Sequence, residues 1–126
     1  MDEDIQSWLR YAETDMAAAE GLHRLRLDPS PLFHLQQAVE KTLKALLLKQ
    51  TSSEPPRIHG LRRLAERCKL NLNSDQTLLL EKLSNYHVES QYPGDWEVTP
   101  PEVIGEEAEA LMPAAREFIE WLRSQI

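Results

Sequence analysis

Polar side chains that could do chemistry recur at helical spacing in the second quarter of the chain. Steps of three or four residues place them on one side of a helix, beside an apolar stripe. Together they offer an imidazole, an amide and two ammonium groups, which can line a groove. A second interpretation is that the histidine is a hydrogen-bonded interior residue, and that the lysines pair with acids such as Glu40 or those of a neighbouring helix. The residues are His34, Gln37, Lys41 and Lys44.

Two further stretches carry unusual chemistry for a plain helical protein. His59 lies among arginines where a short helix is expected to begin, and we interpret it as a helix cap or as a hydrogen bond that closes the fold. Tyr86 and Tyr92 are followed by Trp96. This aromatic surface can stack on a base, or it can pack the end of a helix against its neighbour.

Several common catalytic signatures are absent from the sequence. The four glycines lie too far apart to form a phosphate-binding loop or a dinucleotide-binding turn. There is one cysteine, Cys68, and the four histidines are scattered without a His-Glu-x-x-His pair. We therefore expect no metal site and no cofactor.

Charge is distributed unevenly along the 126 residues, whose net charge is −7. Residues 1–69 hold 10 acids and 11 bases, whereas residues 70–126 hold 11 acids and 3 bases. This field disfavours long nucleic acid, and the basic run at 57–69 either binds a phosphate locally or is a solvated helix face. The acidic start, the single cysteine and the lack of a long apolar run predict a cytoplasmic protein without a membrane span.

The elements that must position these side chains are helices almost throughout. Apolar residues at steps of three and four predict helices at about 3–25, from near 30 to the loop at 51–56, at about 59–69, at about 74–90, and after Pro100-Pro101. No segment alternates with the period of a strand. With mostly short connections, this pattern predicts an all-α fold, an antiparallel four- to five-helix up-and-down bundle, in a single domain spanning 1–126.

Three motifs together resemble a known family. They are Phe-His-x-Gln-Gln-Ala-x-Glu-Lys-x-Leu-Lys-Ala-Leu-Leu at 33–47, His-x-Leu-x-x-Leu at 59–64 and Tyr-x-x-x-x-x-Tyr-Pro-Gly at 86–94. The chain resembles the HEPN domain, a family of small all-helical prokaryotic proteins, over nearly its whole length. The resemblance implies a homodimer, and a frequent pairing with a separately encoded minimal nucleotidyltransferase. It also implies either nucleotide binding or, in toxin members, RNA cleavage without a metal.

The ribonuclease members carry an arginine followed four to six residues later by a histidine. That motif is absent here, and the nearest approach is Lys82 with His87. In such a mechanism the histidine moves a proton, while the guanidinium holds the phosphate through two parallel hydrogen bonds. A lysine supplies charge but not that geometry, so Lys82 and His87 are weak catalytic candidates and the protein is more readily a binding protein than an enzyme.

Three functions therefore remain open. The leading one is a non-catalytic homodimer that binds a nucleotide or a nucleotidyltransferase partner in a toxin-antitoxin-like pair. The second is a degenerate metal-independent ribonuclease, and the third is a purely structural dimerisation partner. For nucleotide binding, the resemblance and the spacing select the residues His34, Gln37, Lys41, Lys44, Tyr86 and Tyr92.

Overall fold

The computed structural model describes residues 2–25, 30–86 and 101–126. Within these ranges the chain forms helices joined by short loops, and no strand is present. The elements are α1 (Asp2–Arg24), α2 (Ser30–Thr51), α3 (Leu61–Arg67), α4 (Ser74–Leu83), the 3-10 helix η1 (Ser84–Tyr86) and α6 (Pro101–Arg123).

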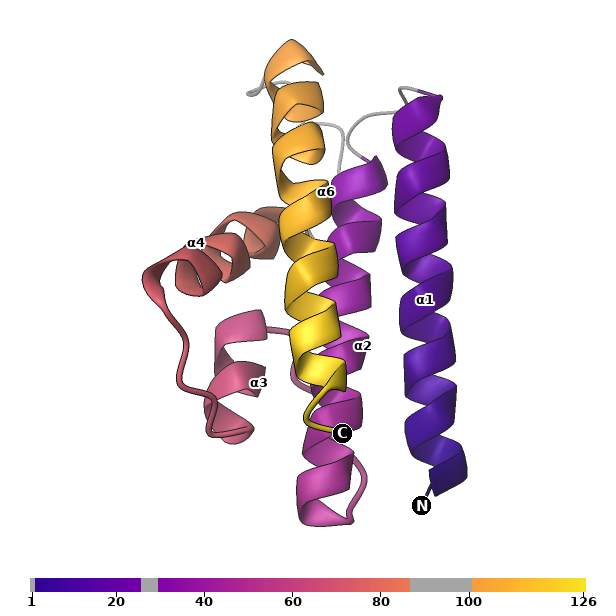
Figure 1. Ribbon diagram of the computed structural model, residues 1–126, viewed down its shortest axis with the longest axis vertical. Helices are drawn as coiled ribbons and strands as arrows, with labels where there is room; N and C mark the ends of the chain where they lie inside the picture. Colours follow the sequence, from indigo (N-terminus) through magenta and orange to yellow (C-terminus); the bar gives the residue numbers. More distant parts are fainter. Residues whose placement is uncertain (1, 26–29, 87–100) are drawn as a thin grey trace.

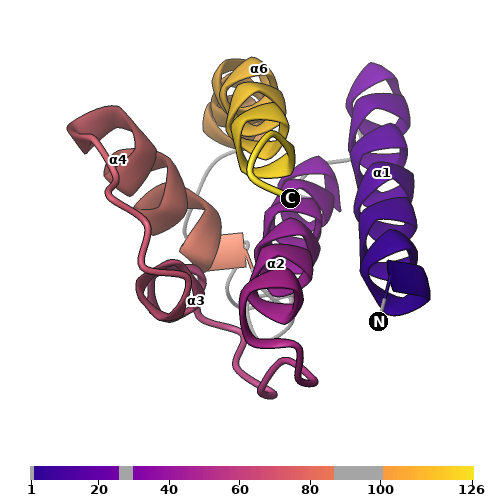
Figure 2. The same cartoon turned by 60° about the horizontal axis from the view of Figure 1, so that its bottom comes forward.

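The helices form an up-and-down bundle with α2 at its centre. Figure 1 shows α1 running one way, α2 returning beside it, the shorter helices α3 and α4 on the other side of α2, and α6 descending to the C-terminus. In Figure 2, α1, α3 and α6 surround α2, and α2 contacts all three of them. The predicted all-α bundle is therefore confirmed, and α2, which carries the polar motif, lies where it meets most of the other elements.

The core explains why these segments fold as helices. Each long helix has apolar side chains at steps of three and four, and burying these stripes against one another removes them from water. The side chains of α2 are buried on several sides, as expected for a central helix. The largest fully buried side chains are Met16, Leu32, Leu35, Gln36, Leu43, Leu46, Leu61, Leu64, Leu80, Leu83, Ile119 and Leu122.

Two helix boundaries differ from the sequence prediction. The third helix begins at Leu61 with Gly60 as its N-cap, so His59 is not the cap. It ends because Lys69 adopts a left-handed backbone conformation (φ 57°), which lets the amides of Lys69 and Leu70 donate back to carbonyls of the last turn. The fourth helix ends at Leu83 and continues as the 3-10 turn η1, whereas the predicted extension over 87–90 lies outside the described residues.

Two features of the long helices bear on the fold as a whole. Pro113 lies inside α6, yet the helix continues to Arg123, at the cost of one backbone hydrogen bond that proline cannot donate. None of the helices that the structure describes combines the length and the apolar character needed to cross a membrane.

The start of α4 is held by a capping box. The side chain of Asn73 accepts a hydrogen bond from the amide of Gln76 (2.8 Å), and the side chain of Gln76 accepts one from the amide of Asn73 (2.9 Å). We expect Asn73→Ala to lower the free energy of unfolding by about 0.5–2 kcal/mol, because the helix loses a side-chain acceptor for its free amides. Urea unfolding followed by circular dichroism measures this.

Two variants check that prediction. Asn73→Asp keeps the acceptor and should stay close to the wild-type stability. Asn71→Ala, at an exposed position two residues earlier, should change stability by less than about 0.5 kcal/mol. Equal losses in Asn73→Ala and Asn71→Ala would show that the capping box does not stabilise α4.

Candidate functional site

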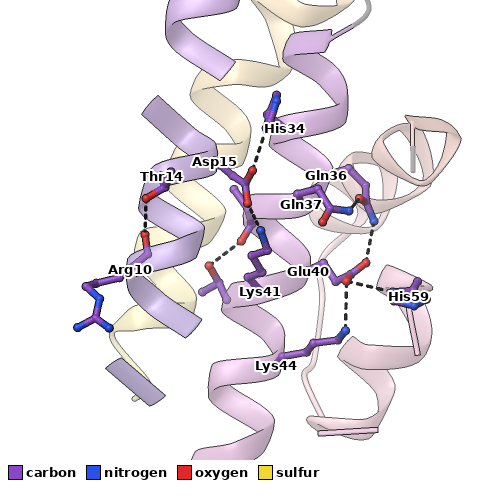
Figure 3. Close-up of polar contacts among 12 residues, drawn as sticks. Arg10, Thr14, Asp15, His34, Gln36, Gln37, Glu40, Lys41, Lys44 and His59 are labelled. Atoms are coloured by element: carbon purple, nitrogen blue, oxygen red, sulfur yellow. Dashed lines mark hydrogen bonds and ion pairs between the residues drawn. The ribbon is translucent and has the colours of Figure 1, made fainter. Parts of the chain in front are cut away.

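The first part of the candidate site is a carboxylate of α1 that holds two residues of α2. Asp15 is only 7% exposed, and its two oxygens face His34 and Lys41. The Nδ1 atom of His34 lies 2.8 Å from Oδ1, and the ammonium of Lys41 donates to Oδ2. Figure 3 shows Asp15 between these two side chains. Asp15 precedes His34 by 19 residues and Lys41 by 26 residues, so these two contacts tie α1 to α2.

The second part is a carboxylate of α2 that holds groups from α2 and from the loop before α3. Glu40 is 4% exposed, and it accepts a hydrogen bond from the ammonium of Lys44, at 3.2 Å from Oε2. The Nδ1 atom of His59 lies at the same distance from the same oxygen. The amide of Gln36 donates to Oε1 at 3.2 Å, and Gln37 donates in turn to Gln36 at 2.7 Å. These contacts are drawn in Figure 3.

We call these eight side chains the carboxylate network, and its charges balance internally. Asp15 and Glu40 supply two negative charges, and Lys41 and Lys44 supply two positive charges. The charges of these four side chains therefore cancel. Buried carboxylates require such partners, because an unpaired charge in the interior is strongly disfavoured. The members are Asp15, His34, Gln36, Gln37, Glu40, Lys41, Lys44 and His59.

Two aromatic rings of α1 lie against the lysines of this network. The ammonium of Lys44 is 5.5 Å from the centre of the Trp8 ring, and that of Lys41 is 5.9 Å from the centre of the Tyr11 ring. Both distances suit an attraction between a cation and an aromatic face. Because the side chain of Lys44 is only 8% exposed, Glu40 and Trp8 together replace most of the water that its ammonium would otherwise bind.

Four of the six predicted nucleotide-binding residues lie on α2, where they are divided between the two carboxylates. His34, Gln37, Lys41 and Lys44 all belong to the carboxylate network, so the interpretation in which the lysines pair with acids describes the geometry of the protein. His59 makes the expected fold-closing hydrogen bond, to Glu40.

The remaining candidates lie elsewhere. Tyr86 belongs to η1 and donates its hydroxyl to Glu107 of α6 at 3.1 Å, which is a pairing separate from the carboxylate network. Lys82 is exposed in the last turn of α4. His87 and Tyr92 lie outside the described residues. Of the weak catalytic candidates Lys82 and His87, only Lys82 lies within the described residues.

The fold perturbs the ionisation of Tyr86. Burial raises the pKa of its phenol from 10.0 to about 12, and the negative charge of Glu107 and the hydrogen bond to it act in the same direction. The neutral phenol is the form that can donate to a carboxylate, so the folded state holds the proton more tightly than the unfolded chain does.

This raised pKa predicts an alkaline loss of stability. The contribution of Tyr86 is fully present below pH 10.0 and disappears as the pH rises toward about 12, because the unfolded chain releases the proton first. Tyr86→Phe should therefore be less dependent on pH than the wild type in this window, as measured by urea midpoints. Tyr11→Phe, at an exposed ring, is the control and should follow the wild type. Equal pH dependence in all three proteins would contradict the prediction.

Sequence reasoning missed the aromatic half of the site and the role of Asp15. A signal for Asp15 was available: it lies three residues after Ala12 and directly before Met16, so it sits at the edge of the buried stripe of α1. An acid in that position requires a cation from another element. Trp8 lies on the same side of α1 as the apolar residues Ile5 and Ala12, and nothing in the sequence shows that its ring meets Lys44.

Next to these rings, α1 and the end of α2 enclose an open pocket of about 480 Å³. Its walls come from one face of α1, from Leu48 of α2 and from the loop that follows α2. Among the described residues, no group of three or more His, Cys, Asp or Glu side chains is arranged to hold a metal ion. The pocket is lined by Asp4, Ser7, Trp8, Tyr11, Leu48, Glu54 and Pro55.

The sequence matches a known family model, and the fold is similar to a solved structure. The family model described as the HEPN domain matches residues 5–125. Among solved structures, the fold is similar to the crystal structure of TT1696 from Thermus thermophilus, with a TM-score of 0.80 and 22% identity over 97% of this chain and 98% of that chain. A comparison with curated proteins finds no match. Because the family model covers nearly the whole sequence, the chain belongs to the HEPN domain family.

Proposed function

We propose that this HEPN-domain protein is a non-catalytic binding module, a homodimer that works with a separately encoded nucleotidyltransferase in a toxin-antitoxin-like pair. One observation carries the choice of partner binding over nucleotide binding. The basic side chains of the α2 motif are already paired in the free protein: His34 and Lys41 pair with Asp15 and so join α2 to α1, and Lys44 pairs with Glu40 within α2.

The charge balance of the carboxylate network supports this choice. A phosphate group is attracted by basic groups in excess of the local acids, whereas here two lysines face two carboxylates. Moving Lys44 to a ligand would also leave Glu40 without its ammonium partner at a position that is 4% exposed. The absence of the Arg-His ribonuclease motif supports the non-catalytic part of the proposal.

Binding to a separately encoded minimal nucleotidyltransferase tests the proposal. Size-exclusion chromatography with light scattering should give twice the chain mass for the protein alone, and a stable complex when the two purified proteins are mixed. A monomer that elutes separately from the nucleotidyltransferase at every concentration would overturn the proposal. RNA incubated with the protein in the same experiment should remain intact, and cleavage that is lost in His87→Ala would favour the ribonuclease alternative instead.

Nucleotide binding is a second candidate, favoured by the outer edge of the network. The side chains of His34 and Lys41 are 27% and 24% exposed, and the ring of Tyr11 beside Lys41 is 60% exposed. These groups offer a cation, an imidazole and an aromatic face at the surface.

Calorimetric titration with ATP distinguishes the two candidates. The partner-binding proposal expects no saturable heat for the isolated protein. Saturable binding that is lost in Lys41→Met, and retained in Lys49→Met, would establish the second candidate. Lys49 is an exposed lysine of the same helix, so its variant makes the same change of charge without touching Asp15.

A further inference from the structure

We propose that the pocket beside α1 binds a planar organic cation, the guanidinium of an arginine side chain presented by a partner protein. The proposal goes beyond the function given above, because it names a ligand chemistry and holds whichever protein carries the arginine. It starts from the composition of the pocket, whose lining contains two carboxylates and two aromatic rings but no basic side chain.

The carboxylates come from two different elements. Asp4 belongs to the first turn of α1, and Glu54 to the loop after α2, so only the tertiary fold brings them to the same pocket. Both are exposed, and within the described part of the chain neither takes part in an ion pair. The start of a helix accounts for an acid at position 4 but not for one at position 54. The nearby guanidinium of Arg10 donates to Ser7 of the lining at 3.2 Å and pairs with neither carboxylate. Two carboxylates without an ion-pair partner at one pocket favour a cation.

The aromatic rings strengthen that selection. Trp8 and Tyr11 both line the pocket, and both already lie near ammonium groups of α2, at 5.5 Å and 5.9 Å. Those ammonium groups belong to Lys44 and Lys41, whose charges are balanced by the carboxylates of the network. Because each ammonium is paired with a carboxylate, it repels an arriving cation less than an unpaired ammonium would.

The shape of the pocket favours arginine over lysine. A volume of about 480 Å³ admits one long side chain with its adjoining peptide units. Leu48 and Pro55 supply apolar surface for the methylene groups of the stem. A guanidinium is planar and weakly hydrated, so it stacks on an aromatic ring while it donates hydrogen bonds in its plane to carboxylates. The ammonium of lysine is compact and strongly hydrated, and it does not stack in this way.

Nuclear magnetic resonance of the full chain tests the proposal with a blocked tripeptide, acetyl-Gly-Arg-Gly-amide. The probe should shift the indole N–H signal of Trp8 and saturate with a Kd on the order of 1 mM, the range for a single side chain. The same peptide with citrulline in place of arginine should bind at least about tenfold more weakly, because citrulline keeps the shape but has no charge. Trp8→Phe identifies the signal.

Matched variants separate the pocket from the general field of the protein. Asp4→Asn combined with Glu54→Gln should weaken binding at least about fivefold. Asp75→Asn combined with Glu117→Gln removes the same charge from a smaller pocket of about 260 Å³ that contains Trp121, and it should leave binding at Trp8 unchanged. Neither pair alters a buried residue, so both proteins should remain folded.

Four results of the experiments described above would overturn the proposal. They are the absence of any shift at Trp8, equal binding of the citrulline peptide, equal weakening by both pairs of variants, and a shift at Trp121 in place of Trp8. A lysine peptide or a free diamine that binds as tightly as the arginine peptide would also overturn it, because the pocket would then accept any small cation. None of these results depends on the nucleotidyltransferase, so the proposed function fails or survives separately.

Discussion

Replacing Glu40 by alanine is expected to lower the free energy of unfolding by about 3–5 kcal/mol, the range for removing one partner of a buried ion pair. The side chain of Lys44 is only 8% exposed, and Glu40 is its carboxylate partner at 3.2 Å. Without Glu40 the ammonium must either remain unpaired in the interior or open the packing around α2. The amide of Gln36, which is fully buried, also loses its acceptor. Urea unfolding followed by circular dichroism measures the change.

An exposed ion pair provides the control for this prediction. Glu81 lies 3.3 Å from Arg62, and both side chains are more than half exposed. Glu81→Ala should therefore cost no more than about 1 kcal/mol. If Glu40→Ala costs as little as Glu81→Ala, the ammonium of Lys44 is solvated and the carboxylate network does not hold the fold.

A double variant shows whether the cost comes from the unpaired charge. Glu40→Met combined with Lys44→Met removes both charges and fills similar volume with apolar groups. We expect the double variant to be more stable than Glu40→Ala by about 1–3 kcal/mol, although Gln36 still lacks its acceptor. A double variant that is less stable than Glu40→Ala would show that the loss comes from packing and not from charge.

Leu80→Ala is expected to cost about 2–5 kcal/mol of unfolding free energy, because it leaves a cavity in the main core. Leu80 is fully buried and belongs to the cluster that joins α4 to α2, α3 and α6. The short helix α4 depends on this contact, since a helix of 10 residues is marginal without tertiary packing.

Leu78→Ala is the matched control on the same helix. Leu78 is 48% exposed, so its replacement should change stability by less than about 0.5 kcal/mol. The two variants make the same chemical change and have the same effect on helix propensity, so their difference reports burial alone. Equal unfolding midpoints would mean that α4 does not pack on the bundle as described.

The outcomes for individual elements show where sequence reasoning succeeds. The long helices were predicted close to their observed ends, because the period of apolar residues and the prolines between them are local signals. The third helix was predicted two residues too long at each end, because Gly60 and Lys69 adopt cap conformations that periodicity does not reveal. The start of α4 at Ser74 was predicted correctly, although the cap is Asn73.

The candidate site was predictable only in part. The spacing of His34, Lys41 and Lys44 places them on one side of a helix. It leaves two interpretations open, a groove that binds a ligand or ion pairs inside the protein. The position of Asp15, 26 residues before Lys41 in the sequence, shows that Lys41 forms an internal ion pair. The sequence alone does not show which residues of two packed helices come into contact.

The sequence by itself determined the helical fold class, the family and the set of polar residues on α2. The tertiary structure decided the partners of those residues, and it assembled the pocket from α1, α2 and the following loop. The physical reason is the distance along the sequence over which each kind of signal acts. Hydrophobic periodicity acts between residues three or four positions apart, whereas ion pairs and pockets depend on how distant helices pack, and that packing follows from the shape of the whole core.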